Sequence, residues 1–170
     1  MTYTFIDKLP DNIDINPVLI SGYESALFDR KEYLFVKQDD DKSALYEIRF
    51  EAHCSPFKEA IIFDNTLAVG HEEYFYLFDM TQKSNLLRLE MSGYFGHLYF
   101  DNNQFLVACA CGLYSINKLG KINWQNLSLG IDGLIVTDFT DNKIYGSGDW
   151  DPPGGWKNFI LDNGTGVIIS

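Results

Sequence analysis

The residues best suited to chemistry lie in one segment, residues 146–156, which is rich in glycine, proline, aspartate and tryptophan. Trp150 and Trp156 could form an aromatic wall, with Asp149 and Asp151 beside them as acceptors for a sugar hydroxyl, a cation or an arginine. Two consecutive prolines stiffen the segment, so its side chains are presented rather than left mobile. We therefore predict a ligand- or partner-binding site at these four residues. The alternative is that both tryptophans fold back over an open end of the core.

Asp149 and Asp151 are also candidates for the acid and base of a hydrolase. Such chemistry depends on the separation of the two carboxylates, which the sequence does not supply. The chain contains no Gly-x-Ser-x-Gly elbow, no phosphate-binding glycine loop with Lys-Ser or Lys-Thr, and no His-Glu-x-x-His. An enzyme is therefore the weaker expectation, and we expect no catalytic residue and no cofactor.

Cys109 and Cys111 are two residues apart on an expected strand, so they share the face that a strand could use to bind a metal. His71 and His97 are the remaining ligands that could be imagined. Two cysteines without a second pair leave the ligation incomplete, and the run Ala-Cys-Ala-Cys-Gly suits close packing between sheets. We expect small buried thiols here and no metal site.

The elements that would position these residues belong to a repeat. The phrase Ser-Gly-Tyr occurs at residues 21–23 and 92–94, each time before an apolar run that ends in Phe-Asp. Two imperfect copies follow the same plan, and aligning Phe28, Phe63, Phe100 and Thr137 gives spacings of 35, 37 and 37 residues. A period of this size is typical of repeat architectures, because one such unit cannot bury its apolar face alone.

Helical periodicity is almost absent, and short runs of aromatic and β-branched residues alternate with glycine, asparagine, aspartate and serine. The second and third copies predict strands at residues 66–71, 74–79, 86–91, 97–100, 104–110, 113–117, 121–125 and 133–137. The last copy predicts strands at residues 143–147, 156–162 and 167–169. It lacks a return strand, so an N-terminal strand at 2–6 or 18–20 could complete one sheet with it and remove an exposed edge.

Two further expectations concern the repeat. Tyr23 and Tyr94, which hold matching positions after Ser-Gly, are expected to pack between units. The first copy is the least regular, with an apolar run at 26–29 and an acidic, solvated turn at 39–43.

Three or four strands per unit, with a tight glycine-containing turn in the middle hairpin, are typical of a propeller blade. The hairpins at residues 78–81, 116–124 and 161–167 resemble the blades of quinoprotein-type β-propeller repeats, in which an Asp and a Thr-Gly pair precede a strand that often carries Trp. The resemblance implies the architecture only, because that family's quinone- and calcium-binding residues do not map onto this chain. Residues 146–156 also resemble a motif of small bacterial repeat proteins, which brings no activity.

We therefore predict an all-β fold of four imperfect β-meander repeats, forming a small or partial β-propeller. The alternative is an open, twisted antiparallel sheet or a partial barrel. With 170 residues, the chain is expected to be a single β-repeat domain over residues 1–170. A partial propeller could also complete itself by pairing with another copy.

Composition narrows the class of partner. A net charge of −11 repels nucleic acid and anionic lipid and attracts basic proteins. The chain has only three cysteines, a small and odd number that a disulfide framework would rarely show. We therefore expect the thiols to be reduced. The sequence shows neither a basic leader nor the roughly 20 apolar residues of a membrane helix, so we expect a cytoplasmic protein without membrane contact.

Together these observations favour a non-catalytic protein-binding module whose acidic face and Trp-rich loop engage a partner with a basic surface. A concrete version is a bacterial immunity-type protein that neutralises a basic toxin. The alternative is carbohydrate or small-ligand binding through the Trp-rich loop, and a hydrolase is the third possibility.

Overall fold

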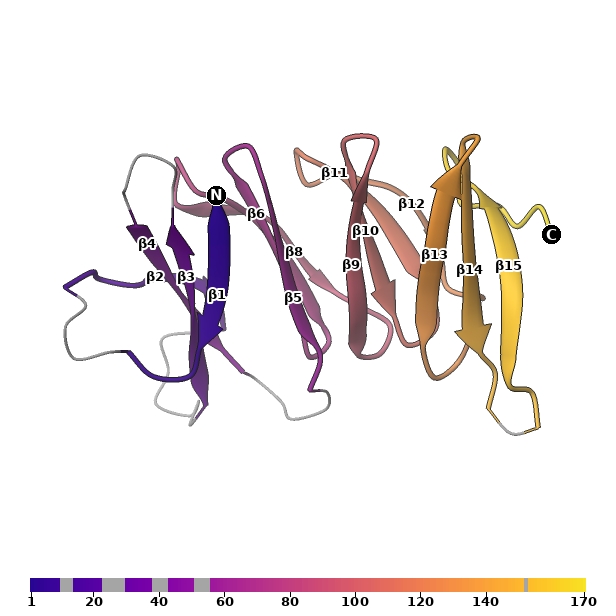
Figure 1. The fold of residues 1–170 in the computed structure, drawn as a ribbon, viewed down its shortest axis with the longest axis horizontal. Helices are drawn as coiled ribbons and strands as arrows, with labels where there is room; N and C mark the ends of the chain where they lie inside the picture. The colour runs from indigo at the N-terminus through magenta and orange to yellow at the C-terminus, as the bar shows by residue number, and fades with distance from the viewer. Residues whose placement is uncertain (10–13, 23–29, 38–42, 51–55, 152) are drawn as a thin grey trace.

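The structure is a computed structural model that describes residues 1–9, 14–22, 30–37, 43–50, 56–151 and 153–170. These residues contain strands and turns and no helix, so none of them forms a helix long and apolar enough to cross a membrane. The strands form four small sheets that follow one another from the N-terminal to the C-terminal end of the molecule (Figure 1). The predicted all-β fold of four repeats is thereby confirmed.

The second, third and fourth sheets are antiparallel meanders, in which each strand pairs with the next one along the chain. The second sheet contains β5 (Lys58–Phe63), β6 (Thr66–His71), β7 (Tyr74–Asp79) and β8 (Ser84–Glu90). The third sheet contains β9 (Phe95–Asp101), β10 (Gln104–Cys109), β11 (Leu113–Asn117) and β12 (Ile122–Asn126). The fourth sheet contains β13 (Leu134–Thr140), β14 (Lys143–Asp149) and β15 (Trp156–Asp162).

The first sheet is built differently, in the order β1-β3-β4-β2. Its strands are β1 (Thr2–Ile6), β2 (Val18–Ser21), β3 (Lys31–Lys37) and β4 (Ser43–Arg49). β1 takes the place that β5, β9 and β13 hold in the other sheets, and β2 lies parallel to β4 at the far edge. The predicted apolar run at 26–29, Tyr23, Cys54 and most of the turn at 39–43 lie outside the described residues.

The predicted pairing of the two chain ends is wrong. Both N-terminal strands belong to the first sheet, because β1 pairs with β3 and β2 pairs with β4. At the other end, Ile168 forms a bridge with Leu161 of β15, in the fourth sheet. The N-terminal strands therefore belong to the first sheet and the C-terminal residues to the fourth, at opposite ends of the row of sheets (Figure 1).

The repeat register differs from the sequence alignment. Two-residue turns join the first and second strands of these sheets, at residues 64–65, 102–103 and 141–142. These turns make Phe63, Asp101 and Thr140 equivalent, whereas the sequence alignment had matched Phe63 with Phe100 and Thr137. One cause is a β-bulge in the middle of β13, which adds a residue to that copy.

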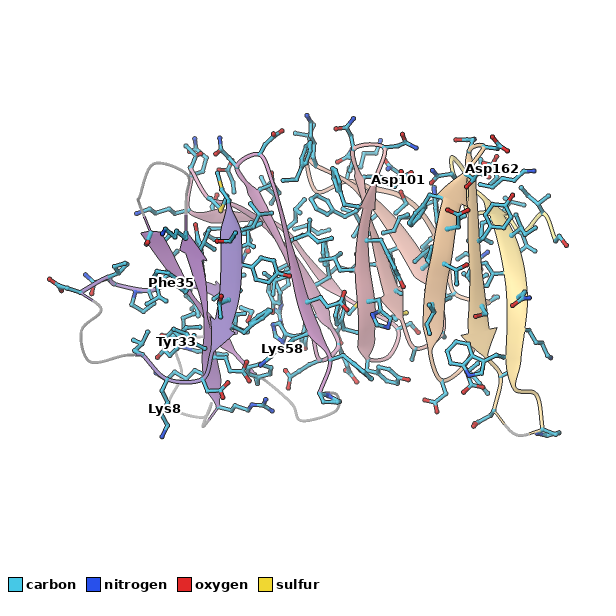
Figure 2. All side chains as sticks on the ribbon, in the orientation of Figure 1. Lys8, Tyr33, Phe35, Lys58, Asp101 and Asp162 are labelled. Atoms are coloured by element: carbon cyan, nitrogen blue, oxygen red, sulfur yellow. The ribbon has the colours of Figure 1, made fainter. Side chains whose placement is uncertain are left out.

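The core consists of three apolar layers, one between each pair of successive sheets. The strand β7 is apolar because it packs on both sides. Tyr76 and Phe78 pack toward the first sheet, while Phe75 and Leu77 pack toward the third. Successive residues of a strand point to opposite faces, so an inner sheet buries both of its faces. Figure 2 shows that side chains fill the spaces between the sheets.

Backbone hydrogen bonds hold successive sheets in place along one edge of the molecule, the edge at which β9 and β13 begin. Phe95 N donates to Glu72 O at 2.5 Å, and Gly133 N donates to Ala110 O at 2.8 Å. Each bond joins the start of the first strand of one sheet, β9 or β13, to the turn between the second and third strands of the preceding sheet. Phe95 also packs on Gly70, where an added Cβ would lie 2.1 Å from the ring, so only glycine fits there. The candidate site lies along this edge, where β9 and β13 begin.

Candidate functional site

A cavity of about 210 Å³ lies beside the start of β13. In Figure 1, β13 begins at the lower edge of the sheets. The lining of the cavity comes from the residue before β5, the start of β9, the start of β13 and the first residue of β15. We call it the aromatic pocket and define it by Phe57, Tyr94, His97, Asp132, Ile135 and Trp156. The pocket therefore joins three successive sheets.

The apolar rim of the aromatic pocket is exposed. Phe57 is 47% exposed, and its ring stacks on that of Tyr94 with centroids 6.1 Å apart and planes 25° apart. Trp156 is 52% exposed and Ile135 is 40% exposed. A Cβ added at Gly133 would lie 3.7 Å from the Tyr94 hydroxyl and 3.9 Å from the Trp156 ring, which shows how closely these residues meet.

The Tyr94 hydroxyl closes one wall of the pocket. It donates to the backbone carbonyl of Asp132 at 2.8 Å and to the Oδ1 atom of the same residue at 3.1 Å. Burial, together with the hydrogen bond to Asp132, raises the pKa of Tyr94 above its usual value. The phenol therefore stays protonated and acts as a donor.

A second carboxylate lies behind His97. Glu59 accepts a hydrogen bond from Leu98 N at 2.7 Å, and its Oε1 lies 2.8 Å from the Nδ1 atom of His97. This pair joins β5 of the second sheet to β9 of the third. The carboxylate that lines the aromatic pocket is thus that of Asp132, while the carboxylate of Glu59 pairs with the lining residue His97.

The structure separates the two tryptophans that the sequence had placed together. Trp156 belongs to the aromatic pocket, whereas Trp150 lines another cavity of about 170 Å³ with Leu129 and Lys157. The Nζ atom of Lys157 lies 5.2 Å from the centroid of the Trp150 ring. The two indoles therefore do not form one wall.

The two predicted aspartates support the loop. Asp149 O accepts a hydrogen bond from Ile131 N at 2.7 Å, and Asp149 N donates to Gly133 O at 2.9 Å. Its side-chain Oδ1 atom accepts a hydrogen bond from Asp151 N at 3.2 Å. Asp149 thus holds the segment that carries Asp132, while Asp151 is exposed.

Sequence reasoning missed most of the pocket. Tyr94 was expected to pack between units, and it does contact the next unit, but through a hydroxyl at the pocket wall. The sequence signal that could have placed Tyr94 at the site is its position just before the first strand of a repeat, on the side of the sheets that carries the Trp-rich loop. Phe57 and Asp132 lie in segments without a clear pattern, and nothing in the sequence singled them out.

Cys109 and Cys111 lie close together at the end of β10. The Sγ atoms of Cys109 and Cys111 are 4.0 Å apart, and Cys111 Sγ donates to Ser92 O at 3.1 Å. Burial raises the pKa of Cys109 to about 11, which disfavours the thiolate that binds metals. Within the described ranges, no group of three or more His, Cys, Asp or Glu side chains is placed to hold a metal ion.

Comparison with known proteins supports the architecture. No family model matches the chain, and no curated protein matches its sequence. Among solved structures, the chain is similar to the crystal structure of BamB from Moraxella catarrhalis, with a TM-score of 0.53 and 10% sequence identity. The match covers 93% of this chain and 49% of that one, so this chain spans about half the length of the structure it matches. This likeness concerns the fold alone, and it supports a propeller-like arrangement of the β-repeats.

Proposed function

We propose that this chain is a non-catalytic module that binds a protein partner through the aromatic pocket. The observation that carries the proposal is the exposed apolar rim formed by Phe57, Ile135 and Trp156. Single exposed apolar residues are common, but a group that converges on one hollow is typical of an interaction site.

The size of the pocket supports a protein partner over a small molecule. Its volume of about 210 Å³ lies below the roughly 300–1,000 Å³ of most small-molecule sites. A pocket of this size suits one or two side chains that project from a partner. The polar groups of the pocket are held in place by contacts within the chain, because Tyr94 bonds Asp132 and His97 pairs with Glu59.

Charge supports a basic partner. The chain carries a net charge of −11, Asp132 lines the pocket, and Glu59 pairs with the lining residue His97. Opposite charge on a partner would speed association and make it dependent on salt. In its most specific form, the proposal is an immunity-type protein that neutralises a basic toxin in the cytoplasm.

The proposal is tested by capturing partners from the source cell with the whole chain as bait, in parallel with Trp156→Ala and Leu119→Ala. Leu119 is 75% exposed in the turn between β11 and β12, away from the pocket lining, which makes it a matched control. We expect the wild type and Leu119→Ala to retain the same basic protein and Trp156→Ala to lose it. Retention by Trp156→Ala, or affinity indifferent to salt, would contradict the proposal.

A second candidate is carbohydrate binding, which the exposed indole of Trp156 beside Asp132 favours. Aromatic rings bind the apolar faces of sugars while a carboxylate accepts from their hydroxyls. A glycan array separates this candidate from the first. Signals lost in Trp156→Ala would support it, and an array without signals would exclude it.

A further inference from the structure

We propose that the aromatic pocket receives an arginine side chain of the basic partner, with its guanidinium between the Trp156 indole and the Asp132 carboxylate. The inference rests on the proposed function, because it concerns the same site. It goes further by naming the chemical group that is recognised.

The chain itself places cations over its aromatic rings. The guanidinium carbon of Arg30 lies 4.5 Å from the centroid of the Phe50 ring, and that of Arg88 lies 4.7 Å from the Tyr74 ring. Such contacts are strongest on tryptophan, and they gain strength where water is excluded.

The two tryptophans of the Trp-rich loop differ in this respect. Lys157 covers the ring of Trp150, whereas no cation of the described part of the chain lies over the ring of Trp156. Lys157 follows Trp156 directly in β15, and successive strand residues point to opposite faces of a sheet. The nearest lysine in the sequence is thus directed away from the aromatic pocket, and the Trp156 ring remains available to a cation from outside.

Asp132 is the carboxylate placed to pair with that cation. Its Oδ1 atom accepts from Tyr94, but no described residue donates a hydrogen bond to its Oδ2 atom. Both oxygens of Glu59, by contrast, are engaged by His97 and Leu98. An incoming donor therefore finds acceptor capacity at Asp132.

Arginine fits this arrangement better than lysine does. A guanidinium can stack on a ring while its in-plane N–H groups donate to a carboxylate, and it is less strongly hydrated than an ammonium group. The methylene stem of arginine would pack on the exposed rim residues Phe57 and Ile135. A neutral side chain of the same shape would satisfy the rim but not Asp132.

The test uses blocked tripeptides of sequence Gly-Arg-Gly, Gly-Lys-Gly and Gly-citrulline-Gly, titrated into the whole chain to about 10 mM. The readout is the NMR signal of each indole N–H, assigned with Trp→Phe variants at positions 124, 150 and 156. We expect the arginine peptide to shift the Trp156 signal saturably. The lysine peptide should bind several-fold more weakly, and the citrulline peptide should not saturate.

Three variants sharpen the test. Asp132→Asn should weaken arginine binding about tenfold, because it removes the charge and keeps the shape. Trp156→Phe lacks the reporter indole, so its binding is followed by the backbone amide NMR signals of the pocket residues; it keeps a ring and should retain part of the affinity. Trp150→Phe should bind as the wild type does. Circular dichroism and thermal melting check that each variant is folded.

Equal binding of the arginine and citrulline peptides, a shift of the Trp150 signal alone, or no shift at the highest concentration would overturn the inference. These outcomes differ from failure of the proposed function. If Trp156→Ala loses the captured partner but no arginine peptide binds, the function stands and the arginine inference falls. If the arginine peptide binds at Trp156 but partner capture is independent of Trp156, the recognised group stands and the proposed function falls.

Discussion

The hydroxyl of Tyr94 donates to Asp132 at two oxygens, the backbone carbonyl at 2.8 Å and the carboxylate Oδ1 at 3.1 Å. The two residues are 38 positions apart, about one repeat of the chain. Tyr94 precedes β9 of the third sheet, and Asp132 precedes β13 of the fourth. A single phenol thus holds the acidic group of the aromatic pocket against the neighbouring sheet, which makes Tyr94 a positioning residue.

Replacing Tyr94 by Phe should uncouple these two segments while keeping the ring that stacks on Phe57. We expect the free energy of unfolding to fall by about 1 kcal/mol, the usual contribution of one hydrogen bond. Capture of the basic partner should weaken as well, because Asp132 loses its orientation. Urea unfolding and partner capture measure the two effects. Tyr145→Phe, on the outer face of β14, is the control, and a Tyr94→Phe variant equal to it would contradict the assigned role.

Gly166→Ala should destabilise the fourth sheet strongly. Gly166 has a φ of +69°, and an added Cβ would lie 2.3 Å from the Trp124 ring. Left-handed strain and overpacking together predict a loss of roughly 2–5 kcal/mol in urea unfolding. Gly155→Ala is the matched control, because Gly155 has a φ of +58° but no atom within 4 Å of the added Cβ. Its loss should be strain alone, about 1–2 kcal/mol, and equal losses would argue against the Trp124 contact.

His71 should make the stability of the protein sensitive to acid. Burial lowers the pKa of His71 from 6.5 to about 4, against an opposing effect of Glu32, and its Nε2 atom lies 2.9 Å from Ser21 Oγ. Between these two pKa values the unfolded chain binds a proton that the folded chain does not, so stability falls as the pH falls from about 6.5 to 4. The shift corresponds to roughly 3 kcal/mol in total.

The measurement is urea unfolding from pH 7 to pH 4 in the wild type and in His71→Gln. The variant is expected to be less stable at pH 7 and to lose less stability on acidification. The difference between the two curves isolates His71 from the carboxylates, which titrate in both proteins. Parallel curves would show that His71 is not the acid-sensitive group.

Cys109 should resist alkylation in the folded protein. Its pKa of about 11 leaves little of the reactive thiolate at pH 8, and the side chain is only 1% exposed. Cys111 is partly exposed and should react first with iodoacetamide, as judged by mass spectrometry of the digested chain. In urea the two should react at similar rates. Equal rates in the folded protein would mean that this part of the third sheet opens readily.

The strands could largely be predicted from the sequence, because the alternation of apolar runs with turn residues is a local property. The predicted ranges 66–71, 74–79, 113–117 and 156–162 coincide with β6, β7, β11 and β15. Other boundaries shifted by one to three residues, as for β13, whose bulge arises from pairing with β14. The C-terminal run at 167–169 forms only an isolated bridge, at Ile168.

The sequence alone determined the repeat and the all-β class, and it singled out the Trp-rich loop as a candidate site, since each inference depends on the order of neighbouring residues. Tertiary structure decided that Trp150 and Trp156 serve different cavities, because strand pairing sets the face to which each side chain points. It also brought Phe57, Tyr94 and Asp132 together from three repeats. Packing between sheets joins residues a whole repeat apart, and such contacts leave no periodic trace in the chain.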